Sequence, residues 1–305
     1  MFKKLLYLIP NTLTLVSLFL GFSSILFSIQ AINDLYLSAR STSTQSAALA
    51  IEAYPERFLA LAGILIFLAS LFDFLDGFSA RYLKAATPMG KQLDSLVDFV
   101  SFGLAPAVLF FTITLIAVEH IPEAGIYYSL WDGFLTDWVR ERIFLCKLLA
   151  FILPSCTMFR LARFNLIQEK RPYFEGLPST YAGALMGIIL TFNFYLTPLA
   201  NWIGVSNNFT WLLPFFKVTE QLFFNYFFLI VIYITVSLLM VTRIRFYKIE
   251  AIIASNKGKT YVIPLFIVLA ILSALFFKYV YVLVGLGYIL FSMVYFILRY
   301  RVDAN

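Results

Sequence analysis

Residues 73–98 read DFLDGFSARYLKAATPMGKQLDSLVD, which places four aspartates and an arginine close together in an otherwise apolar sequence. The whole chain has 305 residues, of which 61% are hydrophobic and 13% charged, and its mean hydropathy is +0.87. Because a soluble domain is nearer ~25% charged, we infer that a lipid bilayer surrounds this one. Ionised carboxylates at the edge of a membrane are costly, so four of them at helical spacing need a compensating cation.

Windows without charged residues predict the membrane spans. The apolar runs are long and continuous rather than alternating, which argues against an all-β fold. A helix needs ~20 residues to cross a bilayer, so we predict an all-α, polytopic helical bundle. It has about eight transmembrane helices, expected at residues 5–28, 57–79, 94–118, 143–166, 178–198, 221–242, 260–277 and 280–298.

The distribution of Lys and Arg predicts the orientation of the bundle. With the N-terminus in the cytoplasm, most Lys and Arg fall on the inner side, from Lys3 and Lys4 to Arg299 and Arg301. An even number of spans then returns the C-terminus to the cytoplasm. The net charge of +6 therefore reports topology, and no nucleic-acid partner is expected. We expect an integral membrane protein of a bacterial inner membrane, surrounded by membrane lipids.

The four aspartates are spaced so that two helix ends direct them toward one point. Asp73 and Asp76 are at i and i+3 at the inner end of the second predicted helix, and therefore on one face. Asp94 and Asp98 are at i and i+4 at the inner start of the third. Four bare carboxylates would repel one another, whereas a pair of Mg²⁺ or Mn²⁺ ions would remove the conflict.

Residues beside the aspartates suit a phosphate group. Gly77 leaves room for a phosphate or a ribose to approach the backbone. Gly90 is expected to precede the third helix, whose free N–H groups favour an anion, and Arg81 can form a forked contact with a phosphate. A plainer alternative is that the aspartates pair with nearby Arg and Lys. This alternative would explain a single aspartate better than it explains four aspartates at this spacing.

The pattern resembles the signature of the CDP-alcohol phosphatidyltransferase family. It reads Asp73-x2-Asp76-Gly77-x2-Ala80-Arg81-x8-Gly90-x3-Asp94-x3-Asp98. Members of this family are integral membrane enzymes with a six-helix core. They move a phosphatidyl group from a CDP-linked lipid to an alcohol and release CMP. The resemblance implies one membrane domain over residues 1–305, with a catalytic core in 1–200 and additional helices in 201–305.

The resemblance also implies a role for each aspartate. Asp73, Asp76 and Asp94 would hold one metal ion. Asp73, Asp94 and Asp98 would hold a second, and Asp98 would also be the catalytic base. The cofactor would be two ions of Mg²⁺ or Mn²⁺, and the active site would face the cytoplasm.

The donor, CDP-diacylglycerol, is expected to contact residues from two parts of the chain. Asn11 and Thr14 lie in the first apolar helix and need hydrogen-bond partners there. The cytosine base and a contact between helices would both serve, and the choice stays open. The remaining donor-binding residues expected from the signature are Gly77, Ala80, Arg81 and Gly90.

Four flanking stretches resemble those family members that use L-serine as the acceptor alcohol. They are IPNTLT (9–14), VSFGLAPA (100–107), RLARFN (160–165) and FEGLPST (174–180). One detail departs from the family pattern. Relatives more often have a proline soon after Gly-Leu-Pro, whereas Ser-Thr-Tyr follows here.

A serine acceptor brings a carboxylate and an ammonium group as well as its hydroxyl. Arg160 and Arg163, at i and i+3, would hold the carboxylate, while Asn165 and Ser101 would orient the molecule. The alternatives are that both arginines anchor the helix near lipid phosphates or bind the diphosphate of the donor.

The sequence leaves two alternative functions and a possible homodimer open. The same reaction could use glycerol 3-phosphate, inositol or its phosphate, or choline. A divalent-cation transporter is a more distant alternative, although carriers place their sites nearer the middle of the membrane. Gly183 and Gly187 form a G-x-x-x-G pattern, which allows close helix contact and would suit a homodimer.

Overall fold

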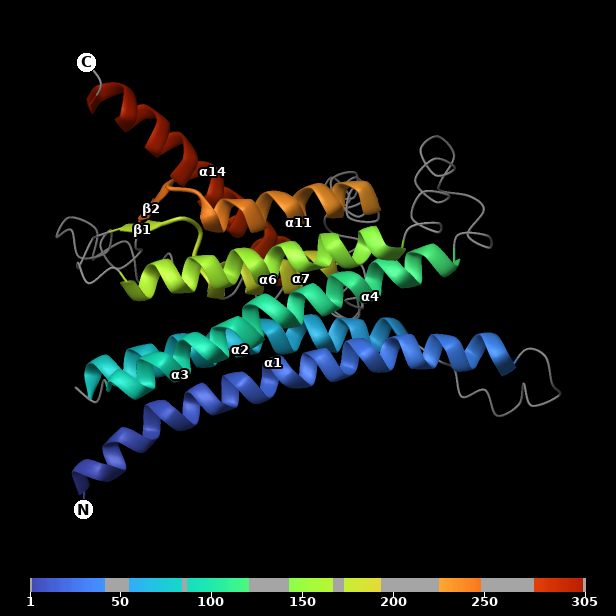
Figure 1. Ribbon diagram of the computed structural model, residues 1–305, viewed down its shortest axis with the longest axis horizontal. Helices are drawn as coiled ribbons and strands as arrows, with labels where there is room; N and C mark the ends of the chain where they lie inside the picture. Colours follow the sequence, from blue (N-terminus) through green and yellow to red (C-terminus); the bar gives the residue numbers. More distant parts are fainter. Residues whose placement is uncertain are drawn as a thin grey trace, which may run out of the picture.

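The computed structural model describes residues 2–41, 55–83, 87–120, 143–166, 173–192, 225–247 and 277–303. In these parts the chain forms long helices packed along one another, with a small two-stranded sheet at one end (Figure 1). The helices are α1 (Phe2–Ser41), α2 (Pro55–Tyr82), α3 (Pro88–Asp98), the π-helical segment η1 (Phe99–Leu104), α4 (Ala105–His120), α6 (Ile143–Leu166), α7 (Ser179–Leu190), α11 (Tyr226–Val241) and α14 (Phe277–Asp303). The predicted helical fold is therefore confirmed for this part of the chain.

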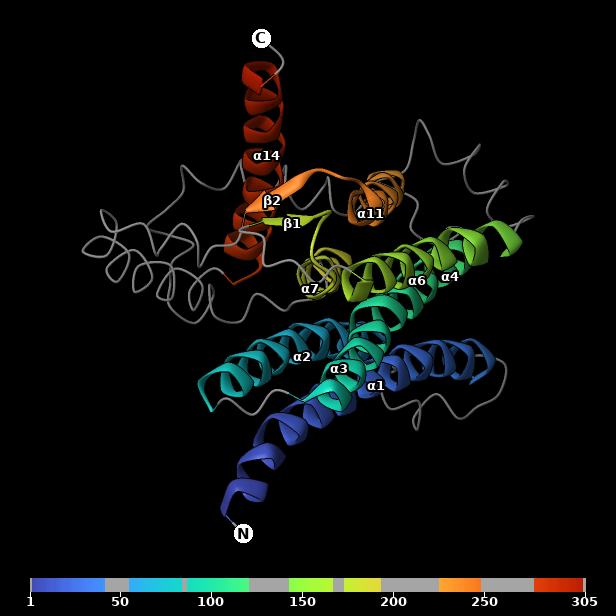
Figure 2. The same cartoon turned by 60° about the vertical axis from the view of Figure 1, so that its left-hand side comes forward.

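The sheet is the one exception to the all-α prediction among the described residues. Strand β1 (Tyr173–Glu175) pairs antiparallel with β2 (Arg245–Tyr247), which places Phe174 opposite Phe246. Figure 2 shows this sheet near the start of α7, between α11 and α14. Three-residue strands carry too little periodicity to be recognised from the sequence alone.

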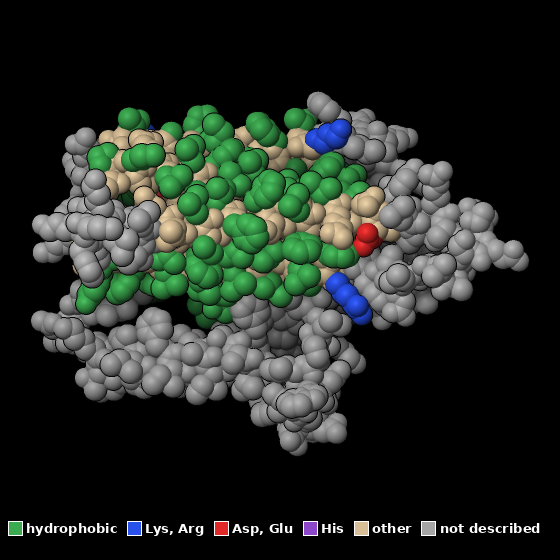
Figure 3. Space-filling view, turned by 90° about the horizontal axis from the view of Figure 1, so that it is seen from below, with side chains coloured by type: hydrophobic (Ala, Val, Ile, Leu, Met, Phe, Trp, Pro, Cys, Tyr) green, Lys and Arg blue, Asp and Glu red, His purple; other side chains and the backbone are tan. Residues whose placement is uncertain are grey.

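Four helical stretches of the described chain are long and apolar enough to cross a membrane. They are Pro10–Asp34, Arg57–Tyr82, Pro88–Ile116 and Leu145–Leu166. Shorter apolar helices cover Ser179–Leu190, Phe227–Val241 and Tyr281–Phe296. The predicted span 260–277 lies outside the described residues apart from its last position. Hydrophobic side chains cover much of the face seen in Figure 3, as expected of a helical membrane protein.

Three helix boundaries differ clearly from the sequence-based expectation, one of them being the end of the helix expected at 178–198, because α7 ends at Leu190. The first helix was expected to end near residue 28, but α1 continues to Ser41, and residues 29–41 contain no Gly or Pro that would stop it. The third helix was expected to start at residue 94, but α3 starts at Pro88. Proline at the first helical position and a threonine cap before it are strong start signals.

The earlier start of α3 corrects the role expected for Gly90. This residue lies inside the first turn rather than before the helix, and its N–H donates to Thr87 Oγ1 at 2.9 Å. Its amide group is therefore already bonded to the cap and is not a free donor for an anion. Thr87 supplies the capping oxygen that the N-terminus of a helix otherwise lacks.

Buried hydroxyl groups join α1 to α2. Ser17 Oγ donates to the carbonyl oxygen of Ala69 at 3.0 Å, and Ser24 Oγ donates to that of Ala62 at 2.9 Å. In an apolar environment such groups need a partner, and a neighbouring helix provides one. These contacts fix α1 against α2 over two turns, one turn away from the aspartates at the end of α2.

The two glycines of the G-x-x-x-G pattern pack within the chain. A Cβ atom at Gly183 would collide with Phe102, and one at Gly187 would lie 3.1 Å from Ile66 Cβ. The small residues thus let α7 approach η1 and α2 closely. The homodimer stays a prediction, but this motif is already used inside one chain.

The start of α1 and the end of α14 lie at the same end of the molecule (Figure 1). The expectation that both termini lie on the cytoplasmic side of the membrane stays a prediction. The C-terminal end of α2, the start of α3 and the β1–β2 sheet also lie at this end. The helix ends that carry the aspartates therefore lie toward the end of the bundle where both termini lie.

Candidate active site

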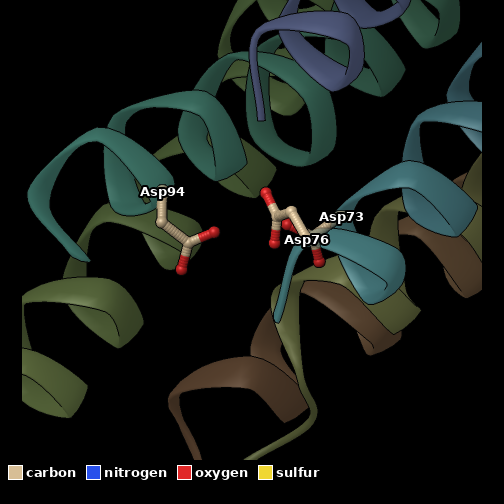
Figure 4. Close-up of side chains that lie close together, drawn as sticks. All are labelled: Asp73, Asp76 and Asp94. Carbon is tan, nitrogen blue, oxygen red and sulfur yellow. The ribbon is translucent and has the colours of Figure 1, made fainter. Parts of the chain in front are cut away.

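Three of the four aspartates form a compact cluster. One carboxylate oxygen from each of Asp73, Asp76 and Asp94 lies within 4.8 Å of the other two. Asp73 and Asp76 come from the end of α2 and face Asp94 on α3 across a gap (Figure 4). Asp76 is buried, and the other two are half-buried. The helical spacing predicted this convergence, and the structure confirms it.

Hydroxyl groups from distant helices hold two of these carboxylates. Thr14 Oγ1, on α1, donates to Asp76 Oδ2 at 2.6 Å, and Thr180 Oγ1, on α7, donates to Asp73 Oδ2 at 3.0 Å. A hydroxyl orients a carboxylate but brings no positive charge. Of the two roles left open for Thr14, the structure shows a contact between helices.

The cluster fits a divalent cation. Its donors are carboxylate oxygens, the ligands that Mg²⁺ and Mn²⁺ prefer, and Thr14 and Thr180, which donate to Asp76 and Asp73, bring no positive charge. Three adjacent negative charges in a poorly solvated place repel one another unless a cation lies between them. These three residues are also the set that the family signature assigns to one metal ion.

Asp98 lies next to this cluster and is only 8% exposed. Its Oδ2 accepts a hydrogen bond from Ser179 Oγ at 2.9 Å, while Oδ1 has no partner in the described part of the chain. Ser179 Oγ in turn accepts from Arg160 Nη1 at 2.6 Å. Since a hydroxyl has one proton, this chain runs in one direction, from the arginine through the serine to the aspartate.

The residue after Asp98 begins the π-helical segment η1. A π-helical turn adds one residue to the helix and often occurs at functional sites. Here it lets the helix continue into α4 with Asp98 at its junction. Ser101 belongs to η1 and is fully buried, where its Oγ donates to the Ser17 carbonyl oxygen at 3.1 Å.

A pocket of about 170 Å³ opens beside the aspartates. Its polar lining combines three carboxylates with two cationic side chains, which is an arrangement suited to a small zwitterion. The residues that line it are Asp73, Lys91, Asp94, Ser95, Asp98, Arg160, Leu161, Phe164, Asn165, Phe174, Pro178, Ser179 and Thr180.

The structure separates the four residues expected to bind the acceptor. Arg160 and Asn165 line the pocket, whereas Ser101 and Arg163 are not part of its lining. Ser101 serves the contact between η1 and α1. Arg163 donates to backbone carbonyl groups, among them those of Glu175 at 2.8 Å and Val241 at 3.0 Å.

The expected donor-binding residues lie around the same helix ends. A Cβ atom at Gly77 would meet nothing within 4 Å, so there is open space beside this backbone. Arg81 is exposed, and its Nε donates to the Gly77 carbonyl oxygen at 3.1 Å. Ala80 is half-buried one turn after Asp76. A Cβ atom at Gly90 would lie 3.5 Å from Asn11 Oδ1, which brings α1 next to α3.

The sequence profile of the CDP-alcohol phosphatidyltransferase family matches residues 7–218. The chain belongs to this family. The matched region contains the aspartate cluster, Asp98 and every residue that lines the pocket. The family resemblance expected from the signature is thus confirmed by a match over more than half of the chain.

Individual relatives of the CDP-alcohol phosphatidyltransferase family agree in name. The chain is 36% identical over 133 residues to the CDP-diacylglycerol–serine O-phosphatidyltransferase of Bacillus subtilis, covering 44% of this chain and 61% of that protein. It is 37% identical over 134 residues to the Saccharomyces cerevisiae enzyme of that name (41% and 39%) and 35% identical over 134 residues to the Methanocaldococcus jannaschii one (43% and 52%). In each case the match spans less than two thirds of the relative.

Sequence reasoning missed several pocket residues of this family member. The most important are Ser179 and Thr180, which contact Asp98 and Asp73. The sequence feature that could have identified them is the pair of hydroxyl residues after Gly-Leu-Pro, where relatives more often have a proline. Lys91 was also missed. Its Nζ lies 5.8 Å from the centre of the Phe164 ring, close enough for a cation–π contact.

Proposed function

We propose that this protein transfers the phosphatidyl group of CDP-diacylglycerol to L-serine, giving phosphatidylserine and CMP. One observation carries the choice of acceptor. Three atoms of pocket residues have no hydrogen-bond partner in the described part of the chain, namely Asp98 Oδ1, Arg160 Nε and Asn165 Oδ1. Serine offers three matching groups: a hydroxyl, a carboxylate and an ammonium.

Each unpartnered atom corresponds to one group of the acceptor. Asp98 Oδ1 can accept the hydroxyl proton, Arg160 Nε can donate to the carboxylate, and Asn165 Oδ1 can accept from the ammonium. Buried polar atoms without partners are costly, and a serine molecule would satisfy all three at once. The names of the three relatives support the same acceptor.

The donor would lie over the aspartate cluster. Two ions of Mg²⁺ or Mn²⁺ held by Asp73, Asp76, Asp94 and Asp98 would, when bound, polarise the phosphorus and offset the charge of the departing CMP. Gly77 leaves space beside the backbone for the nucleotide. Arg81 is exposed one turn beyond Asp76, where a phosphate oxygen can reach it.

The chemical step follows from the position of Asp98. Its Oδ1 takes the proton of the serine hydroxyl as the serine oxygen bonds to the lipid-side phosphorus. The bond between that phosphorus and the oxygen of CMP breaks, and CMP leaves with the electron pair. Ser179 holds Oδ2, so Oδ1 is the oxygen left for the proton.

Other acceptors would fit the pocket less well. Ethanolamine and choline lack a carboxylate and would leave Arg160 Nε without a partner. Inositol lacks both charged groups. A phosphorylated acceptor carries more negative charge and would need more cationic partners. Among the residues that line the pocket, only Arg160 and Lys91 are cationic. By the positive-inside pattern, the pocket faces the cytoplasm of a bacterial inner membrane.

An acceptor panel tests this proposal. The purified protein in detergent micelles would be given labelled CDP-diacylglycerol with L-serine, serinol, ethanolamine, glycerol 3-phosphate or inositol. We expect CMP release with L-serine well above that with every other alcohol, and phosphatidylserine as the lipid product by mass spectrometry. Faster release with glycerol 3-phosphate or inositol would reject serine and keep the transferase. No release with any alcohol would reject both.

Arg160→Gln is expected to raise the KM for serine by roughly 10- to 150-fold, because a hydrogen bond to a charged group contributes ~1.5–3 kcal/mol. The KM for CDP-diacylglycerol should change much less, since a contact kept equally in ground and transition states affects binding alone. Arg57→Gln, an exposed position at the far end of α2, is the matched control. If Arg160→Gln weakened donor binding and left serine unchanged, the arginine would belong to the donor site.

A further inference from the structure

Arg163 joins three parts of the chain through its guanidinium group. From α6, its Nη1 donates to the Val241 carbonyl oxygen at 3.0 Å. Its Nη2 donates to the carbonyl oxygens of Glu175 at 2.8 Å and Thr242 at 3.2 Å. Val241 is the last residue of α11, and Glu175 is the last residue of β1.

The chemistry of a helix end explains this contact. The last carbonyl groups of an α-helix have no partner within the helix, and a cation beside them is favoured by the helix dipole. The planar, forked guanidinium can reach several oxygens at once, which an ammonium cannot. Arg163 therefore closes the end of α11 and ties β1 to it.

Backbone contacts tie the same two segments together. Gly176 N–H donates to the Ile244 carbonyl oxygen at 2.9 Å, and Leu177 N–H donates to that of Leu239 at 3.1 Å. Gly176 has a φ of +79°, and a Cβ atom there would overlap the Met240 carbonyl oxygen. A glycine is therefore required both by the backbone conformation and by the close approach.

We call Arg163, Gly176 and the β1–β2 pair the clasp. The segment that it holds leads directly into the pocket. Phe174 and Pro178 line the pocket, and Ser179 and Thr180 follow at the start of α7, bonded to Asp98 and Asp73. The clasp therefore fixes the residues that hydrogen-bond to Asp98 and Asp73.

We propose that Arg163 is a positioning residue and that the clasp holds residues 173–180 against the catalytic aspartates. Residues 239–247 would then be required to support the acceptor pocket, although they are not among its lining residues and lie beyond the family match at 7–218. This role replaces the serine contact that the sequence suggested for Arg163. The proposal rests on the proposed function for the reaction that the clasp supports.

Two variants disrupt the clasp in different ways. Arg163→Gln removes the fork, and Gly176→Ala inserts a methyl group against Met240. Both are expected to lower kcat/KM for serine by about 10- to 100-fold, because a misplacement of ~1 Å can cost ~10²-fold. Gly287→Ala is the matched control, since a Cβ atom at Gly287 would meet nothing within 4 Å. It should keep the parent value.

Amide hydrogen exchange tests whether the clasp holds this segment, and it does not depend on enzyme activity. In the metal-free, substrate-free protein, the amides of Leu177 and Ala182, which donate to the carbonyl oxygens of Leu239 and Pro178, should exchange at least about tenfold faster in Arg163→Gln and Gly176→Ala, because local opening controls exchange. The control should keep the parent rate. Parent-like exchange at both amides in both variants would overturn the proposal. This readout stays informative even if the parent protein does not use serine.

A crosslink separates positioning from substrate contact. Glu175 and Arg245 are paired across the sheet, and the usual spacing of paired residues, ~4.5–5.5 Å, is within disulfide range. The native Cys146 and Cys156 are buried. Glu175→Cys with Arg245→Cys, oxidised in the Arg163→Gln background, should restore kcat/KM to within a few-fold of the same pair in the parent. If the disulfide forms without restoring activity, Arg163 acts on substrate and the clasp proposal is wrong.

Discussion

Asp98→Asn is expected to lower kcat by at least ~10²-fold, the usual contribution of a general base. The amide keeps the shape of the side chain and can still meet Ser179, but it cannot accept a proton. Binding of CDP-diacylglycerol should be retained better than in Asp73→Asn or Asp94→Asn, since the compact cluster of Asp73, Asp76 and Asp94 stays intact. Single-turnover kinetics with saturating L-serine would measure the chemical step, and equilibrium binding would measure donor affinity.

Variants of the cluster provide the comparison for Asp98. Asp73→Asn and Asp94→Asn should each lose metal and donor binding together, because each residue is assigned to both ions. Thr14→Val should be much milder, since it removes only a hydroxyl that orients Asp76. Near-normal turnover of Asp98→Asn at saturating serine would remove this residue from the role of base.

Removing divalent cations is expected to abolish transfer completely. Three carboxylate oxygens within 4.8 Å of one another would repel the diphosphate of the donor unless a cation lies between them. Adding excess EDTA should bring CMP release to the level of a blank without protein, and adding Mg²⁺ or Mn²⁺ back should restore it. EDTA saturated with Mg²⁺ beforehand is the control for effects of the chelator itself.

Metal binding can also be measured directly, without relying on turnover. Binding of Mn²⁺ followed by electron paramagnetic resonance should be clear in the parent protein and much weaker in Asp73→Asn. Full turnover in excess EDTA, with divalent metal shown to be absent by elemental analysis, would contradict the metal site. If Asp73→Asn lost turnover but still bound Mn²⁺ as the parent does, the metal would bind somewhere other than the aspartate cluster.

Much of this fold could be predicted from the sequence, because helices follow from local patterns. Apolar runs of about the length of a bilayer predicted helices that match α2, α6, α11 and α14 within about five residues, whereas α7 is shorter than predicted. The aspartates could be brought together on the same basis. Spacings of three and four residues place side chains on one face of a helix, so two helix ends were enough to predict the cluster.

The acceptor side depended on contacts that no local pattern records. Arg160 and Arg163 share a helix face by spacing, yet Arg160 meets Ser179 in the pocket and Arg163 meets carbonyl groups at the end of α11. Their partners are up to 79 residues away in sequence, and the packing of α11 and β1 against α6 decides which carbonyl groups Arg163 meets. By itself the sequence determined the helices and the aspartate cluster, since backbone geometry sets both. Only the tertiary structure decided the pocket, because side chains from separate segments acquire their partners when those segments pack.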